Sequence, residues 1–117
     1  MIKNFRIVKG LTRCLLGVVF VGIISGCVRS GMLTEGIHSF KLQDYRRAFV
    51  LLMPVAKAGN PDAQYAIGYM YYYAEGVVED RKKAWFWISC AAKAGQPDAI
   101  VALKILEPWH TQITTEP

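Results

Sequence analysis

Apolar residues recur at helical spacing along most of the chain after residue 31, with short polar joints between the apolar runs. This periodicity is typical of amphipathic helices that bury one face. Two prolines should modify the pattern, because Pro54 should kink or loosen the second helix and Pro108 should stop the fifth. The spacing predicts helices at about 32–41, 45–58, 61–73, 81–94 and 97–107.

One octapeptide occurs twice in this helical region. Residues 56–63 read AKAGNPDA and residues 92–99 read AKAGQPDA, an offset of 36 (92 minus 56). A recurrence of this length is typical of solenoids, in which each unit buries its apolar face by stacking on the next. The repeat therefore predicts an all-α fold, a short α-solenoid of helix-turn-helix repeats, with about two repeats plus flanking helices.

The octapeptide itself has the residues of a joint between two helices. Gly59 suits the left-handed residue that ends one helix. Asn60 can cap the next helix, Pro61 fits its first position, and Asp62 lies favourably in its first turn. In the second copy Gln96 replaces Asn60, which predicts a poorer cap in the same frame.

Three segments resemble Sel1-like repeats, relatives of the tetratricopeptide repeats, and the resemblance covers roughly 40–106: RRAFVLLMPVAKAGNPDAQ (46–64), AQYAIGYMYYYAEGV (63–77) and EDRKKAWFWISCAAKAG (79–95). Ala74 departs from the family pattern, which has glycine at that turn position. Small residues at Ala48, Ala63, Gly68 and Ala84 should let helix axes approach closely. The resemblance implies that the α-solenoid is right-handed and that it is a module that binds proteins. The positions matching the family pattern are Ala63, Ile67, Gly68, Met70, Tyr71, Gly76, Val77, Asp80, Ala84, Trp87, Ala91, Ala92 and Gly95.

The N-terminal segment has the order of a secretory signal. Met1 to Arg13 is basic, and Cys14 to Ile24 is apolar but shorter than the roughly 18 residues that suggest a spanning helix. The sequence Ile-Ser-Gly-Cys at 24–27 resembles a bacterial lipobox, which implies that Cys27 is the lipid-modified first residue of the mature chain. An uncleaved signal anchor or a chance cysteine is the alternative.

These assignments divide the chain into a lipoprotein signal peptide at 1–26, a lipidated cysteine with a short tether at 27–31, the solenoid at 32–109 and a tail at 110–117. Val28 follows Cys27, instead of the aspartate typical of inner-membrane lipoproteins. The expected location is therefore the cell envelope, on the outer membrane facing the periplasm. Cys90 remains as either a packed small hydrophobe or an exposed thiol able to pair between chains.

The net charge of +5 does not indicate nucleic-acid binding. Lys3, Arg6, Lys9 and Arg13 lie in the first 26 residues, which contain no acidic residue. The remaining 10 basic residues (14 minus 4) nearly balance the 9 acidic ones. The basic character thus belongs to the targeting segment, and no nucleic acid is expected as a partner.

Tyrosines on the third helix are the candidate partner-binding residues. Tyr69, Tyr72 and Tyr73 fall on one broad side together with Tyr65, and Phe86 occupies a position where the family commonly has a polar residue. Tyrosine combines a large contact area with a hydrogen-bonding tip, which suits a binding face. The alternative is that these rings complete a core made small by the low number of repeats.

Catalytic patterns are sparse. His38 and His110 do not pair with cysteine or carboxylate at metal-ligand spacing, and both are expected on the surface. No catalytic residue, metal or cofactor is therefore predicted. The favoured hypothesis is a lipid-anchored adaptor that holds an unknown envelope or periplasmic protein, with self-association helping so short a solenoid. The alternatives are an envelope enzyme or ligand binder acting on peptidoglycan or an antibiotic, and an accessory protein of a secretion or immunity system.

Overall fold

The computed structural model describes residues 28–114, with side chains to residue 112. The signal segment and Cys27 lie outside the described residues. Residues 28–41 are helical, so the 28–31 stretch expected as a tether is part of a helix. The residues from Met32 onward form one compact unit, and the packing described below is that of this unit.

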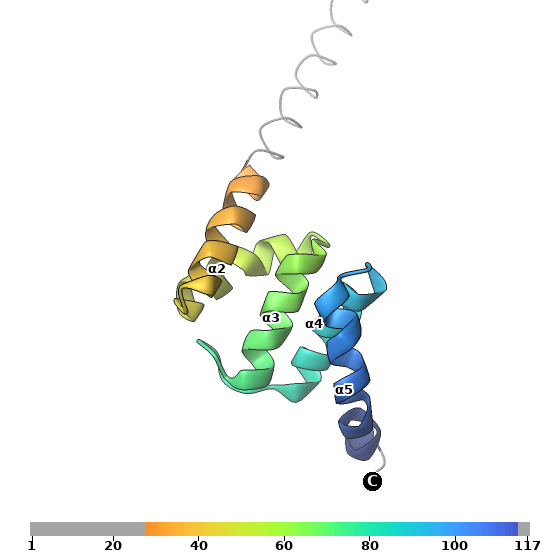
Figure 1. The fold of residues 1–117 in the computed structure, drawn as a ribbon. Helices are drawn as coiled ribbons and strands as arrows, with labels where there is room; N and C mark the ends of the chain where they lie inside the picture. Colours follow the sequence, from red (N-terminus) through yellow and green to blue (C-terminus); the bar gives the residue numbers. More distant parts are fainter. Residues whose placement is uncertain (1–27, 115–117) are drawn as a thin grey trace, which may run out of the picture. The chain divides into compact units, whose positions relative to one another are not determined.

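The described residues form helices and contain no strand. The N-terminal helix (28–41) is followed by α2 (Tyr45–Lys57), α3 (Pro61–Tyr73), α4 (Arg81–Lys93) and α5 (Pro97–Thr114). Along the chain α2 packs on α3, α3 on α4 and α4 on α5 (Figure 1). This stacking of sequence neighbours confirms the all-α helical repeat. No helix within residues 28–114 combines the length and the apolar character needed to cross a membrane.

All four helices from α2 to α5 begin with the same side-chain cap. In each, a side-chain oxygen accepts a hydrogen bond from the backbone N–H three residues later, which satisfies one of the unpaired donors of the first turn. Gln96 was expected to be a poorer cap, yet its Oε1 accepts from Ala99 N at 2.6 Å and the residue is buried. The other caps are Asp44 to Arg47 N at 3.3 Å, Asn60 to Ala63 N at 3.0 Å and Asp80 to Lys83 N at 2.9 Å.

Left-handed residues end the helices where the sequence predicted them, and at one further position. Gly59 and Gly95 have φ of 99° and 87°. Ala74 also takes a left-handed conformation, with φ 57°, so the α3 C-cap is left-handed although the residue is not glycine. Gly76 has a φ of 70°, which favours glycine. A Cβ atom at this position would also lie 2.8 Å from the Tyr45 carbonyl carbon.

Small residues let the helices approach closely. Ala48, Ala63 and Ala84 are completely buried, as expected. Gly68 of α3 faces α4, where a Cβ atom would lie 2.6 Å from Ile88 Cγ1 and 3.1 Å from Ile88 N. The core has one cluster between α2 and α3, covered by the N-terminal helix, and a second between α4 and α5.

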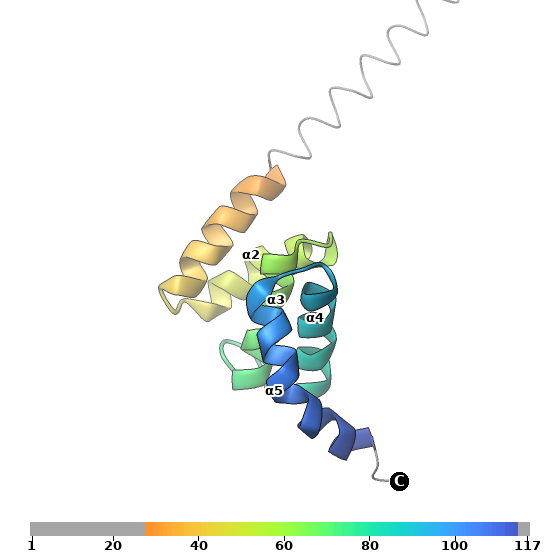
Figure 2. The ribbon, with the colours of Figure 1, turned by 45° about the vertical axis from the view of Figure 1, so that its right-hand side comes forward.

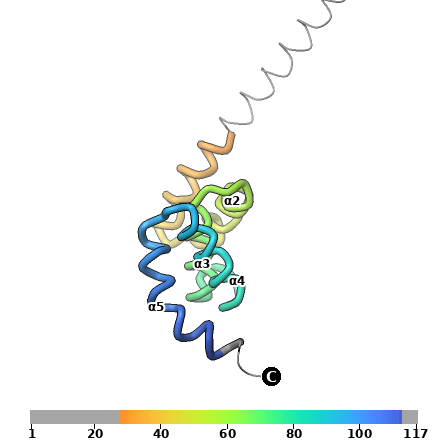
Figure 3. Tube along the Cα trace, turned by 90° about the vertical axis from the view of Figure 1, so that its right-hand side faces the viewer, coloured from red at the N-terminus to blue at the C-terminus, as the bar shows by residue number. Residues whose placement is uncertain are grey.

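Both prolines lie inside helices that continue past them. Pro54 lies inside α2, which continues across it to Lys57. Pro108 was expected to end α5, but the helix continues to Thr114. The Thr111 hydroxyl donates to the Pro108 carbonyl at 2.9 Å, which supports the turn beyond the proline. The last part of α5 bends away from its first part (Figure 2, Figure 3), as a missing backbone donor allows.

Candidate partner-binding groove

The tyrosine side of α3 faces α5 across a cavity of about 280 Å³, here called the tyrosine cavity. The opposite stripe of α3, with Ala63, Ile67 and Met70, is completely buried against its neighbours. The helix therefore has a buried side and a tyrosine side. The cavity is lined by Tyr65, Tyr69, Tyr72, Tyr73, Ile88, Asp98, Val101, Ala102, Ile105 and Leu106.

The tyrosine rings support one another as well as lining the cavity. The Tyr69 centroid lies 4.5 Å from that of Tyr73 and 5.3 Å from that of Phe40 in the N-terminal helix. Tyr72 packs against the second core cluster, whereas Tyr73 is 57% exposed. Each of the two readings of the sequence thus describes part of the set, since Tyr72 packs on the core and Tyr73 is open to a partner.

The phenol groups of Tyr65 and Tyr69 stay protonated at physiological pH. Burial raises the pKa of Tyr65, and the nearby Asp98 carboxylate adds to the effect. Burial and the neighbouring Tyr45 and Tyr73 likewise raise the pKa of Tyr69. These tyrosines therefore offer neutral hydroxyl groups that can donate or accept a hydrogen bond.

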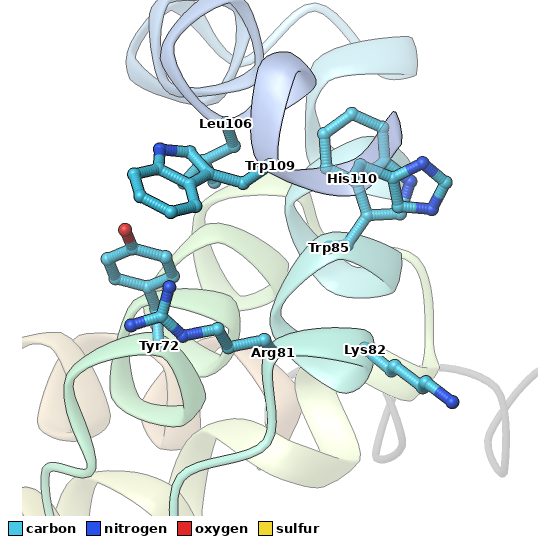
Figure 4. A pocket seen from close by; sticks show the side chains of 7 residues that line it. All are labelled: Tyr72, Arg81, Lys82, Trp85, Leu106, Trp109 and His110. Atoms are coloured by element: carbon cyan, nitrogen blue, oxygen red, sulfur yellow. The ribbon is translucent and has the colours of Figure 1, made fainter. Parts of the chain in front are cut away.

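A second cavity of about 310 Å³, here called the tryptophan cavity, is lined by residues of α3, α4 and α5 (Figure 4). Tyr72 and Leu106 line both cavities, so the two are adjacent, and together they are here called the α3–α5 groove. The Trp85 ring of α4 stacks on His110 of α5, with centroids 4.2 Å apart and planes 19° from parallel. The remaining lining residues are Arg81, Lys82 and Trp109.

A fixed cation lies at the mouth of the tryptophan cavity. The Arg81 guanidinium carbon is 5.1 Å from the centroid of the Tyr72 ring, within the range of a cation–π contact. Arg81 Nε also donates to Glu79 Oε1 at 2.7 Å. This hydrogen bond and the Glu79 charge raise the pKa of Arg81 further, so the group is always charged.

Phe86 is not part of the groove. It is 56% exposed, lines neither cavity, and packs edge-to-face on Trp87 with centroids 5.1 Å apart. His38 is exposed as expected, and His110 is half-buried, with its ring stacked on that of Trp85. Cys90 is half-buried and forms no disulfide within the described residues.

Sequence reasoning missed the contribution of α5. Val101, Ile105 and Trp109 follow one another at intervals of four residues, which places them on one side of the helix. They are 58%, 65% and 55% exposed and all line the groove. The helical spacing could have revealed this stripe, but Pro108 was taken as the end of the helix, which separated Trp109 from the other two.

The groove presents mainly aromatic and aliphatic side chains. Within the described residues no group of three or more His, Cys, Asp or Glu side chains could hold a metal ion. The one carboxylate of the tyrosine cavity, Asp98, accepts from Gln96 Nε2 at 3.4 Å. The arrangement therefore presents aromatic and aliphatic surface with isolated polar groups, as binding sites for peptides and apolar ligands do.

The family model of the Sel1 repeat matches residues 61–96, which span α3, the following turn, α4 and the second joint. This match supports a Sel1-like repeat protein. Sel1 repeats are generally protein–protein interaction modules, and the family is non-catalytic. No curated protein and no solved structure was found to match the chain.

Proposed function

We propose that this chain is a lipid-anchored envelope protein that binds a partner protein through the α3–α5 groove and carries out no reaction. The observation that supports the groove is its exposed apolar surface. Tyr73, Val101, Ile105 and Trp109 are each more than half exposed and gather around the two adjoining cavities. Exposed apolar side chains that cluster in this way mark interaction sites, whereas singly scattered ones need no explanation.

The lipid anchor is proposed from the lipobox at 24–27, with Cys27 as the acylated residue and the outer membrane as its location. Mass spectrometry of protein extracted from membranes should detect a lipidated N-terminal peptide beginning at Cys27. The same peptide should be missing from a Cys27→Ala variant. Recovery of the unprocessed segment 1–25 on the mature chain would contradict the anchor without affecting the groove.

Site-specific photo-crosslinking in cells tests the groove. A photoreactive residue is placed at position 73 inside the groove, and in a matched control at position 86 outside it. The two native side chains, Tyr73 and Phe86, have nearly the same exposure, 57% and 56%. We expect a discrete crosslinked protein from position 73 and none from position 86. The same product from both positions, or from position 86 alone, would place the interface elsewhere.

A second experiment separates binding from folding. Replacing Tyr69 and Tyr72 by alanine should reduce the crosslink while helical content, measured by circular dichroism, stays near that of the wild type. Large aromatic side chains at the centre of an interface commonly account for more than about 1 kcal/mol each. Loss of helical content in this variant would show that the rings are structural, and Tyr73→Ala would then test the groove through an exposed ring.

A further inference from the structure

We infer that the tryptophan cavity binds one large apolar side chain of a partner peptide whose neighbouring residue is Asp or Glu. The inference rests on the proposed function and specifies its partner. It follows from two properties of this cavity, the aromatic walls and the sign of the charge at its mouth.

The aromatic walls border a space of limited size. Trp109 and Leu106 of α5 lie together on one side of Tyr72 of α3 (Figure 4). The stacked pair of Trp85 and His110 forms the side wall. The volume of about 310 Å³ is at the lower end of ligand pockets, roughly 300–1,000 Å³. It therefore suits a single apolar side chain better than a large cofactor.

Positive charge lies beside this apolar space. The charged residues that line the tryptophan cavity are Arg81 and Lys82, and no acidic side chain of the described residues lines it. Lys82 forms no ion pair within the described part of the chain, and it points away from Arg81 (Figure 4). Lys82 therefore adds to the positive potential without competing for the same ligand atom.

Arg81 is prepared to accept a carboxylate. Its Nε is bound by Glu79 and its plane lies near the Tyr72 ring, so the side chain is held in one position. Its terminal nitrogens form no hydrogen bond within the described residues. A carboxylate accepts two parallel hydrogen bonds from such a group, which an amide or a cation cannot do. The acidic residue of the peptide is therefore placed beside the apolar residue that fills the cavity.

The neighbouring tyrosine cavity carries the opposite charge. Asp98 is its charged lining residue, so the groove runs from an end with Lys82 and the Glu79-paired Arg81 to an end with Asp98. Such a difference fixes the direction in which a peptide lies, because reversing the peptide would place its carboxylate beside Asp98. A basic residue next to the apolar anchor would meet Arg81 and Lys82 and be rejected.

Defined peptides test this inference. The probes are fluorescently labelled nonapeptides of glycine and serine whose two central residues are Phe-Glu, Phe-Gln, Ala-Glu or Phe-Lys. Their affinity for the full chain in lipid nanodiscs is measured by fluorescence anisotropy. We expect Ala-Glu to bind at least about tenfold more weakly than Phe-Glu, because a buried phenyl group is lost. Phe-Gln should bind about threefold more weakly, since an ion pair at a partly exposed arginine contributes modestly. Phe-Lys should bind most weakly.

Matched variants assign any preference to this cavity. Trp109→Ala should reduce Phe-Glu binding at least about tenfold, while Phe86→Ala, an equally exposed aromatic residue outside the groove, should leave it unchanged. Arg81→Gln should remove the preference for Phe-Glu over Phe-Gln, and Lys104→Gln, an exposed charge outside both cavities, should retain it.

Three outcomes would overturn the inference: no binding of Phe-Glu, equal binding of Phe-Lys, or binding that Trp109→Ala leaves intact. A crosslink from position 73 in the presence of any of these results would leave the proposed function standing and remove only the assignment of the partner's chemistry. Absence of the crosslink together with a clear Phe-Glu preference would support the assigned chemistry of the cavity and contradict the proposed partner binding at position 73.

Discussion

Replacement of Gly68 by alanine tests the close approach of α3 and α4 directly. A Cβ atom at this position would lie 2.6 Å from Ile88 Cγ1, 3.1 Å from Ile88 N and 3.2 Å from Ala84 O. The Ile88 side chain can change its rotamer, but the two backbone atoms belong to α4 and move only with the helix. The substitution therefore forces the two helices apart.

The expected magnitude is the difference between two opposing effects. Overpacking a close contact costs about 1–3 kcal/mol. Against this, alanine is favoured over glycine inside a helix by about 1 kcal/mol. The net loss of unfolding free energy should be about 1 kcal/mol, with roughly 2 kcal/mol as the upper limit. For a domain of this size, a loss of 1 kcal/mol lowers Tm by about 4–8 °C.

Thermal unfolding of the full chain in a mild detergent, followed by circular dichroism, measures this loss. Gly31→Ala is the matched control, because residue 31 is also helical but a Cβ atom there meets nothing within 4 Å. The control should be neutral or slightly stabilising. If Gly68→Ala raises Tm as much as Gly31→Ala does, the helices are not in close contact at this point and the reasoning is wrong.

Three further predictions concern caps, pH and concentration. Gln96→Ala should lower the unfolding free energy by about 0.5–2 kcal/mol in chemical melts, because the buried Ala99 N–H loses its acceptor; an unchanged midpoint would contradict the cap. The backbone N–H of Lys83, followed by the Lys83 side chain, lowers the pKa of the Asp80 carboxyl, so the stabilisation by Asp80 is present above about pH 4 and is lost as pH falls through the lower folded-state pKa. The stability difference between wild type and Asp80→Ala should therefore shrink on acidification, whereas Asp80→Asn, which keeps an acceptor, should show no such dependence. Because the chain from residue 28 has barely two repeats, its unfolding midpoint should rise with protein concentration as copies associate, and a high midpoint that is independent of concentration in sedimenting monomers would refute this.

Much of the fold could be predicted because its rules are local. The joint at Gly59, Asn60 and Pro61 depends on the conformational freedom of glycine, the side-chain oxygen of the cap and the fixed φ of proline, and each acts within a few residues. The structure has the expected conformation at all three. Burial of Ala63 and Ile67 was equally predictable from helical spacing.

The parts of the candidate site that the sequence did not predict depend on contacts between distant segments. The stacking of His110 on Trp85 joins residues of two helices, and no spacing along the chain indicates it. The Pro108 rule also failed for a physical reason. A proline removes one backbone donor and bends the helix, but packing of the preceding turns can still carry the helix onward. The prediction of a poorer cap at Gln96 was wrong because its longer side chain still reaches the Ala99 N–H, as Asn60 reaches the Ala63 N–H in the first copy.

The linear order of packing, α2 on α3, α3 on α4 and α4 on α5, has a consequence for how the domain opens. Each helix depends mainly on its neighbours, so α5 can detach while α2 and α3 stay folded. Amide hydrogen exchange should then be slowest in α3 and fastest in the part of α5 beyond Pro108. A ligand in the groove contacts α3 and α5 together, so α5 can detach only if the ligand loses its contacts with one of the two helices. Occupancy should therefore slow exchange along the whole of α5, including amides that the ligand never touches.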